Sequence, residues 1–90
     1  MTSESLLEFP CEFPIKAFGR ADKGAQAFVD LVFELVAQHV EGLTTEQISL
    51  NASSGGRFIA VTVNITATSQ AQLDNIYQSL TDHDQVVMSL

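Results

Sequence analysis

The sequence predicts an α+β fold in which two helices cover one face of a four-stranded antiparallel sheet. Four stretches alternate apolar with polar residues, as strands with one covered face do, and two other stretches repeat apolar residues at helical spacing. Their order along the chain is strand, helix, strand, strand, helix, strand, which is the ferredoxin-like βαββαβ sandwich. Right-handed crossovers then give the strand order 4-1-3-2, with the strands numbered along the chain.

The first strand and the first helix occupy the first half of the sequence. Residues 12–20 predict a strand whose apolar positions alternate: Phe13, Ile15, Ala17 and Gly19. Asp22 is expected to cap a helix that begins near Lys23 or Gly24 and ends at residues 41–42. The apolar stripe of this helix follows the 3.6-residue period: Phe28, Val29, Leu31, Val32, Leu35, Val36 and Val40.

A β-hairpin is expected in the middle of the chain. Residues 47–52 alternate polar and apolar side chains, and the turn at residues 53–56 contains two consecutive glycines. The strand that follows, to residue 67, has an apolar residue at every second position: Ile59, Val61, Val63, Ile65 and Ala67. This strand should therefore be central, with one face on the core and the other face open.

The second helix and the last strand complete the pattern. Ser69 with Gln72 three residues later is typical of a capping box at a helix start. The helix should close near Thr81 and Asp82, and its apolar positions share one face: Leu73, Ile76, Tyr77 and Leu80. Residues 86–90 then alternate as a strand, with Val86, Met88 and Leu90 on one side.

Length and composition indicate one small domain that works inside the cell. We expect residues 1–10 to form an N-terminal latch that docks on the domain, and residues 11–90 to form that domain. The net charge of −7 argues against binding to nucleic acid or to an anionic membrane. The single Cys11, the absence of a signal-like start and the lack of any apolar run of about 20 residues all favour the cytoplasm.

The topology brings most of the basic residues to one pole of the domain. The end of the first strand, the start of the first helix and the hairpin turn share this pole, which carries Arg20, Lys23 and Arg57. We therefore expect a carboxylate or phosphate site here, built from five residues: Arg20, Asp22, Lys23, Gly24 and Arg57. In the alternative interpretation the two arginines pair with acidic neighbours at the same pole: Asp22, Asp82 and Asp84.

The open face of the sheet provides a second candidate surface. Phe18 and Phe58 should be near neighbours there, with Val87 close by, and Ser49 and Asn51 belong to the same face of the edge strand. This pattern predicts a dimer or partner interface, unless the latch covers the aromatic rings. The edge strand has no charged residue between Gln47 and Ser53, so it could pair with a second copy of itself.

Enzymatic and RNA-binding functions find little in the sequence. His39 and His83 have no Cys, Ser or carboxylate at a spacing typical of a catalytic triad or a metal site, so no metal and no cofactor is expected. An acylphosphatase-like enzyme could use Arg20 with Asn51 or Asn64, but the glycine-rich phosphate loop is missing. Aromatic residues on two central strands could stack RNA bases, but the surround is not basic.

Several segments together resemble a family of small bacterial proteins, the YbeD-like family. The matching segments are LLEFP at 6–10, FPIKAFG at 13–19, the SxxG turn at 53–56, AVTVNITATS at 60–69 and QLDNIYQSL at 72–80. The resemblance implies a fold similar to the ACT domains that sense amino acids, although residues 21–24 have Lys23 where the ACT loop usually has proline. It brings no known catalytic residues.

The function predicted from the sequence is that of a non-enzymatic regulatory module. We expect an ACT-like homodimer in the cytoplasm that senses a small anionic metabolite, an amino acid or an organic acid. The alternative is an adaptor that binds a partner protein with the open face of its sheet.

Overall fold

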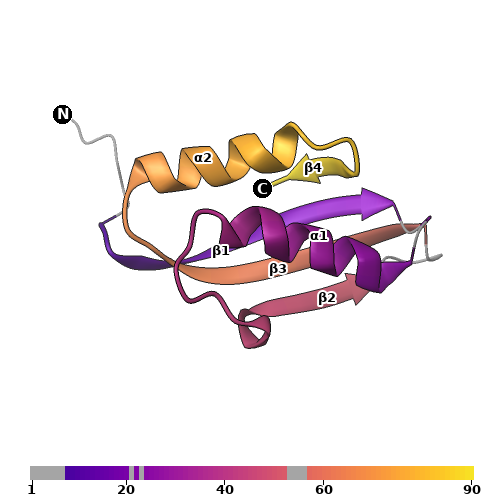
Figure 1. Ribbon diagram of the computed structural model, residues 1–90, viewed down its shortest axis with the longest axis horizontal. Helices are drawn as coiled ribbons and strands as arrows, with labels where there is room; N and C mark the ends of the chain where they lie inside the picture. The colour runs from indigo at the N-terminus through magenta and orange to yellow at the C-terminus, as the bar shows by residue number, and fades with distance from the viewer. Residues whose placement is uncertain (1–7, 21, 23, 53–56) are drawn as a thin grey trace.

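The computed structural model is a two-layer α+β sandwich and confirms the predicted fold (Figure 1). It describes residues 8–20, 22, 24–52 and 57–90. The strands are β1 (Cys11–Arg20), β2 (Ile48–Ala52), β3 (Phe58–Ala67) and β4 (Val86–Ser89), and the helices are α1 (Ala25–Ala37), a short 3₁₀ helix η1 (Thr45–Gln47) and α2 (Gln70–Thr81). The sheet order is β2-β3-β1-β4, which is the predicted 4-1-3-2 order followed from the other edge.

The two long strands at the centre of the sheet pair in antiparallel fashion over their whole length. The register runs from Cys11 opposite Ala67 to Arg20 opposite Phe58. Both helices lie on the same face of these strands (Figure 1). None of the described helices covers the other face, in agreement with the alternation in the sequence (Figure 1).

The core lies between the sheet and the helices and is entirely apolar. Every second residue of β3 is buried in it, as predicted, and so are the central residues of both helix stripes. Its largest fully buried side chains are Ile15, Val32, Val36, Ile59, Val61, Val63, Ile65, Leu73, Ile76 and Leu80. Phe9 packs at the edge of this core, whereas Leu6 and Leu7 of the predicted latch lie outside the described residues, as does the two-glycine turn at 53–56.

Both ends of α1 differ from the prediction. The N-cap is Gly24, with φ of 93°, and no side chain caps the helix, so the expected cap at Asp22 is wrong. The helix ends at Ala37, four residues before residue 41, because the N–H of His39 donates to Val36 O at 2.9 Å and tightens the last turn. Val40 consequently packs against the core from the loop and not from the helix.

Gly19 of β1 leaves room for the ring of Phe28 on α1. A Cβ atom built on Gly19 would lie 2.5 Å from Cζ and 2.7 Å from Cδ1 of that ring. Carbon atoms in contact are ordinarily 3.5–4.0 Å apart. The glycine is therefore required by close packing between the strand and the helix.

A β-bulge in β4 changes the face of the sheet on which the residues after it lie. Ala17 pairs with Ser89 and Phe18 with Met88, but Gly19 pairs with Val86, so Val87 is the extra residue. Only Val86 stays buried. The expectation that Met88 and Leu90 share the face of Val86 is wrong, because the bulge turns them to the open face.

The edge strand β2 has an apolar residue that is more exposed than the alternation of its sequence predicted. Leu50 pairs with Val61, so it lies on the helix side, yet it is 44% exposed. It belongs to the outermost strand, so it has a neighbouring strand on one side only. Gln47, predicted as part of this strand, is the last residue of η1.

Candidate functional site

A pocket of about 310 Å³ lies at the pole where β1 ends and β4 begins. It is lined by Arg20, Asp22, Asp84, Gln85 and Val87. These residues come from the last position of β1, the loop after it, the loop before β4 and the bulge of β4. The bulge thus contributes Val87 to the wall of the pocket.

The pocket contains part of the predicted anion site. It unites Arg20 and Asp22, but Arg57 is exposed and does not line it, Gly24 serves as the helix N-cap, and Lys23 lies outside the described residues. Asp84 joins the lining, so the pocket combines one guanidinium with two carboxylates. This arrangement suits a ligand that carries both positive and negative charge better than a simple anion.

The alternative interpretation of this pole required arginine–aspartate pairs. Within the part of the chain that the structure describes, no salt bridge joins Arg20 or Arg57 to Asp22, Asp82 or Asp84. His83, between the two aspartates, uses its Nδ1 to accept a hydrogen bond from the N–H of Gln85 at 3.1 Å. This bond holds the turn before β4, and the imidazole has a structural partner.

The open face of the sheet presents a continuous apolar row. Phe18 of β1 has Ala60 of β3 on one side and Met88 of β4 on the other. Lys16, two residues earlier, exchanges two backbone hydrogen bonds with Leu90, at 2.8 and 3.0 Å, so Leu90 stands beside Met88 on this face. Met88 is 50% exposed and Leu90 59% exposed. We call Phe18, Ala60, Met88 and Leu90 the apolar row.

The residues predicted for an interface lie on this face, with one exception. Phe58 is opposite Arg20 and 43% exposed, while Ser49 and Asn51 pair with Thr62 and Ala60. The expected position of Val87 beside Phe18 is wrong, because the bulge places Met88 there. Val87 remains exposed, at the rim of the pole pocket.

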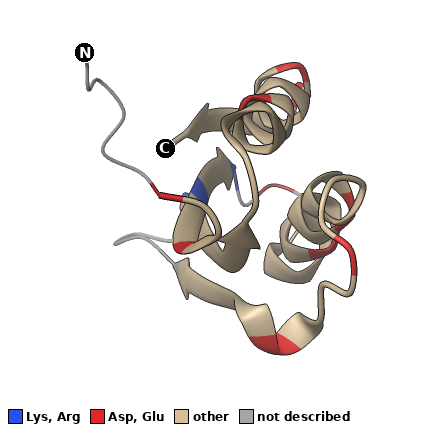
Figure 2. Ribbon diagram, turned by 90° about the vertical axis from the view of Figure 1, so that its left-hand side faces the viewer, with Lys and Arg blue, Asp and Glu red and all other residues tan. Residues whose placement is uncertain are grey.

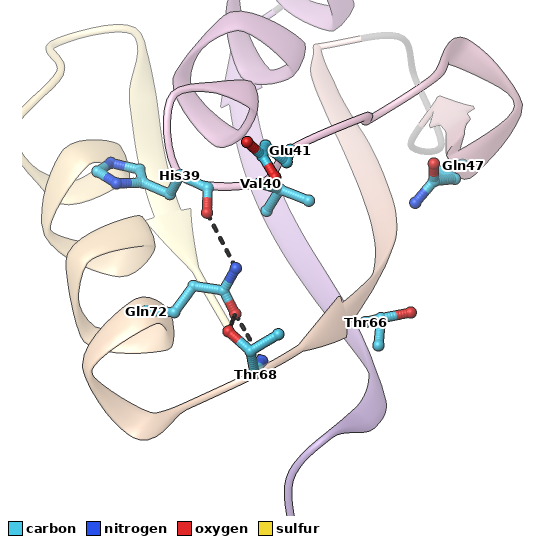
Figure 3. A pocket seen from close by; sticks show the side chains of 7 residues that line it. All are labelled: His39, Val40, Glu41, Gln47, Thr66, Thr68 and Gln72. Carbon is cyan, nitrogen blue, oxygen red and sulfur yellow. Dashed lines mark hydrogen bonds between the residues drawn. The ribbon is translucent and has the colours of Figure 1, made fainter.

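A larger pocket, of about 560 Å³, lies at the opposite pole (Figure 3). Gln72 joins two other lining residues: its amide donates to His39 O at 2.9 Å and accepts from the N–H of Thr68 at 2.8 Å. Gln47, also in the lining, donates to Asn64 O at 2.9 Å. The bonds of Gln72 tie the loop after α1 to the start of α2, and the bond of Gln47 ties η1 to β3, so these polar groups are part of the framework.

A histidine–serine pair that the sequence did not indicate lies beside this pocket. His39 Nε2 and Ser79 Oγ share a hydrogen bond of 2.8 Å between the loop after α1 and helix α2. Such a pair is half of a nucleophilic triad, but no described carboxylate hydrogen-bonds the imidazole. The imidazole also points toward α2 and away from the other lining residues (Figure 3). The pair connects the two helices.

Comparison with known proteins assigns the chain to a family. The family model described as "Protein of unknown function (DUF493)" matches residues 4–90. The chain belongs to this family. A UPF0250 protein of Chromobacterium violaceum is 50% identical over 88 residues, which are 97% of this chain and 94% of the relative. The UPF0250 protein NE1487 of Nitrosomonas europaea is 39% identical over 90 residues and covers both chains completely.

The resemblance to the YbeD-like family of small bacterial proteins is thereby confirmed. The solution structure of protein HP0495 from H. pylori matches the fold with a TM-score of 0.66 at 19% sequence identity, covering 100% of this chain and 94% of the other. This structure supports the fold alone. The names of the family and of these relatives state no activity.

Neither a membrane-spanning helix nor a metal-binding cluster is found among the described residues. None of the helices in the described ranges is long and apolar enough to span a bilayer. The same ranges contain no group of three or more His, Cys, Asp or Glu side chains that could hold a metal ion. Cys11 is a free thiol, half-buried at the start of β1.

Two functional features escaped the sequence reasoning for identifiable reasons. The apolar row needs Met88 and Leu90 to face outward, and strict alternation gives the opposite face when a bulge is not foreseen. Residues 86–90 carry no signal for the bulge, and Gly19 on the paired strand is accounted for by its close approach to Phe28. The His39–Ser79 contact joins residues from two separate parts of the chain, so no short sequence motif indicates it.

Proposed function

We propose that this protein is a non-enzymatic regulatory module of the cytoplasm that acts by docking a partner protein on the open face of its sheet. The apolar row carries the proposal. Its four residues are neighbours through the strand register, and two of them are half exposed or more. A contiguous apolar patch on a polar surface is typical of a protein interaction site.

The surroundings of the row support a protein contact. On one side the sheet offers small polar side chains, Ser49, Asn51 and Thr62, which suit the polar rim of an interface. The row itself combines an aromatic ring with a flexible methionine. Methionine and aromatic residues are enriched at such surfaces because they fill irregular gaps in a partner.

Two variants test the proposal. Met88→Ser removes an exposed apolar side chain from the row, whereas Leu50→Ser removes one of similar exposure from the helix side of β2. Tagged protein is cross-linked in its own host, and the proteins that co-purify are quantified for each variant. We expect Met88→Ser to lose partners that Leu50→Ser retains. Equal losses, or none with either variant, would refute docking through this face.

A second candidate function is the binding of a small metabolite, and the pole pocket favours it. The guanidinium of Arg20 could bind a carboxylate while Asp22 and Asp84 bind an ammonium group, as a zwitterionic amino acid requires. Thermal unfolding in the presence of millimolar amino acids and organic acids tests it. A ligand at 100 times its Kd adds about 2.7 kcal/mol, which is a rise of roughly 10–20 °C for a domain of this size.

The matched control for metabolite binding is another arginine. Arg57 is exposed at the same pole but does not line the pocket. Arg20→Ala should abolish a thermal shift that Arg57→Ala preserves. A shift that survives both substitutions would place the ligand elsewhere.

The predicted homodimer remains part of the proposal. The side chains of β2 carry no charge, so its free edge could add a second copy to the sheet. Sedimentation velocity should then show a dimer that Ser49→Lys dissociates. A monomer at all concentrations would refute this assembly.

A further inference from the structure

Two of the three basic residues that the structure describes, Lys16 and Arg20, lie on the open face of the sheet. Lys16 and Arg20 lie on either side of Phe18 along β1 and share its face, because the intervening Ala17 and Gly19 are buried on the core side. Lys16 stands beside Leu90, and Arg20 is opposite Phe58. Each of these two cations is therefore next to apolar side chains. Arg20 also lines the pole pocket with Asp22 and Asp84, but among the described residues no salt bridge joins it to either aspartate.

The strands themselves contribute a single acidic side chain to this face among the described residues. Among the strand residues that the structure describes, the one carboxylate on it is Glu12, which accepts a hydrogen bond from Thr66 Oγ1 at 3.1 Å at the far end of β1. The other described acids lie before the sheet, in the helices or in the loops: Glu8, Asp22, Asp30, Glu34, Glu41, Glu46, Asp74, Asp82 and Asp84. In Figure 2 the blue segments accordingly lie in or beside the sheet, while red ones are spread over the helices, η1 and the loops.

We infer that the open face binds a peptide segment of another protein, and that this segment carries both acidic and apolar side chains. This inference rests on the proposed docking function and adds the chemistry of the partner. Apolar side chains of the segment would cover the apolar row, and its carboxylates would meet Lys16 and Arg20. Complementary charge of this kind fixes register and excludes wrong partners more than it adds affinity.

The spacing of the two cations limits the segment further. Lys16 and Arg20 are four residues apart on one strand, so their Cα atoms are about 13 Å apart at roughly 3.3 Å per residue. In an α-helix, which rises about 1.5 Å per residue, that distance corresponds to carboxylates about seven to nine residues apart. A helix with an apolar stripe between two such carboxylates would match the row.

Two other occupants fit the charges less well. A second copy docked face to face would bring the lysines and arginines of both copies together, which is unfavourable. RNA carries a negative charge at every nucleotide, and the net charge of −7 on the protein would repel these phosphates. A peptide needs only two carboxylates, one at each of the two cations. Phe18 is also half-buried in the sheet, and Met88 and Leu90 beside it have no aromatic ring, so Phe58 is the one exposed ring that the described strands offer to a base on this face.

A selection experiment tests the inference and does not require the partner to be identified first. Random 16-residue peptides displayed on phage are selected against the whole protein, and enriched peptides are titrated by fluorescence polarisation. The variants are Met88→Ser, Lys16→Gln and Ala71→Glu. The last two change the net charge from −7 by the same single unit, but Ala71 is exposed on α2, away from the sheet. A 20-nucleotide oligouridine is titrated in parallel.

The expected result has three parts. Enriched peptides carry an excess of Asp and Glu together with apolar residues. Met88→Ser weakens their binding about tenfold or more, because it removes apolar contact area. Lys16→Gln weakens it about threefold or more, while Ala71→Glu leaves it unchanged.

The contrary outcomes separate this inference from the proposed function. Peptides that depend on Met88 but have no acidic excess, or equal effects of Lys16→Gln and Ala71→Glu, overturn the acidic partner and leave docking in place. Failure to obtain any peptide that depends on Met88 overturns docking itself. Oligouridine that binds more tightly than the peptides in a Lys16-dependent manner, or a dimer dissociated by Met88→Ser, would assign the face to RNA or to a second copy.

Discussion

The Gly19→Ala substitution adds one methyl group where the ring of Phe28 already lies. The new Cβ would be 2.7 Å from Cδ1 of the ring, about 1 Å inside the normal contact distance. Phe28 is 3% exposed, so its ring has no free space into which it could turn. The strand and the helix must therefore move apart, or the ring must leave its preferred rotamer.

The expected cost follows from the packing of the core. Inserting a methyl group into a well-packed interior typically costs about 1–3 kcal/mol. Alanine is less flexible than glycine in the unfolded chain, which recovers about 0.5–1 kcal/mol. Because the atoms in the way belong to a rigid ring, we expect the upper part of the range and a net loss of about 2 kcal/mol. This corresponds to a fall in Tm of roughly 10 °C.

Urea unfolding followed by circular dichroism measures this loss, and a double-mutant cycle tests its cause. Phe28→Leu alone should destabilise by removing apolar contacts, but in the Gly19→Ala background it also removes the clash. The double variant should therefore be more stable than the sum of the two single losses predicts, by about 1 kcal/mol or more. A loss below about 0.5 kcal/mol for Gly19→Ala, or strictly additive losses, would refute close packing at this site.

Three further predictions concern other parts of the fold. Ser69→Ala should cost about 1 kcal/mol of unfolding free energy in urea, because Ser69 Oγ accepts the N–H of Gln72 at 3.1 Å and caps α2; an unchanged midpoint would argue against the cap. Gly42→Ala should also cost about 1 kcal/mol, although no atom obstructs its Cβ, since φ is 75°; Gly42→Asn should cost less, and equal losses would contradict a backbone cause. Burial raises the pKa of Tyr77 above 10.0, and since Tyr77 is the single tyrosine, absorbance at 295 nm should show its titration at higher pH in the folded protein than in urea. The contribution of Tyr77 to folding stability should therefore be full below pH 10 and be lost as the pH rises through its folded-state pKa, and identical titrations in both states would contradict its burial.

The elements of this fold could be predicted because each long segment satisfies one period along its whole length. β3 buries all five of its odd positions between Ile59 and Ala67, and α2 starts and stops where Ser69 and Asp82 indicated. Right-handed crossovers then leave one order for the strands. Topology thus followed from local patterns together with one general rule of chirality.

The errors arose where contacts between elements decide the local structure. The bulge in β4 is a property of its pairing with β1, so the residues 86–90 alone could not indicate that Met88 would face outward. Leu50 has the pattern of a buried residue but the exposure of an edge position. The pole pocket was half predicted, because chain order brought Arg20 and Asp22 to that end, while the entry of Asp84 and the separation of Arg57 depend on loop geometry.

The ladder between β1 and β3 has a consequence for the order of folding. Its partners are far apart in the sequence, since α1, η1 and β2 lie between them, whereas β2 and β3 are adjacent. The β2–β3 hairpin and the two helices can therefore form early, but β1 and β4 must wait for slow closure of long loops. Because Phe18 comes from β1 and Met88 from β4, the apolar row exists only after the last strand has been made and has docked. A chain that is still being synthesised, or one that is partly unfolded, would not offer this surface, so binding there would report that folding is complete.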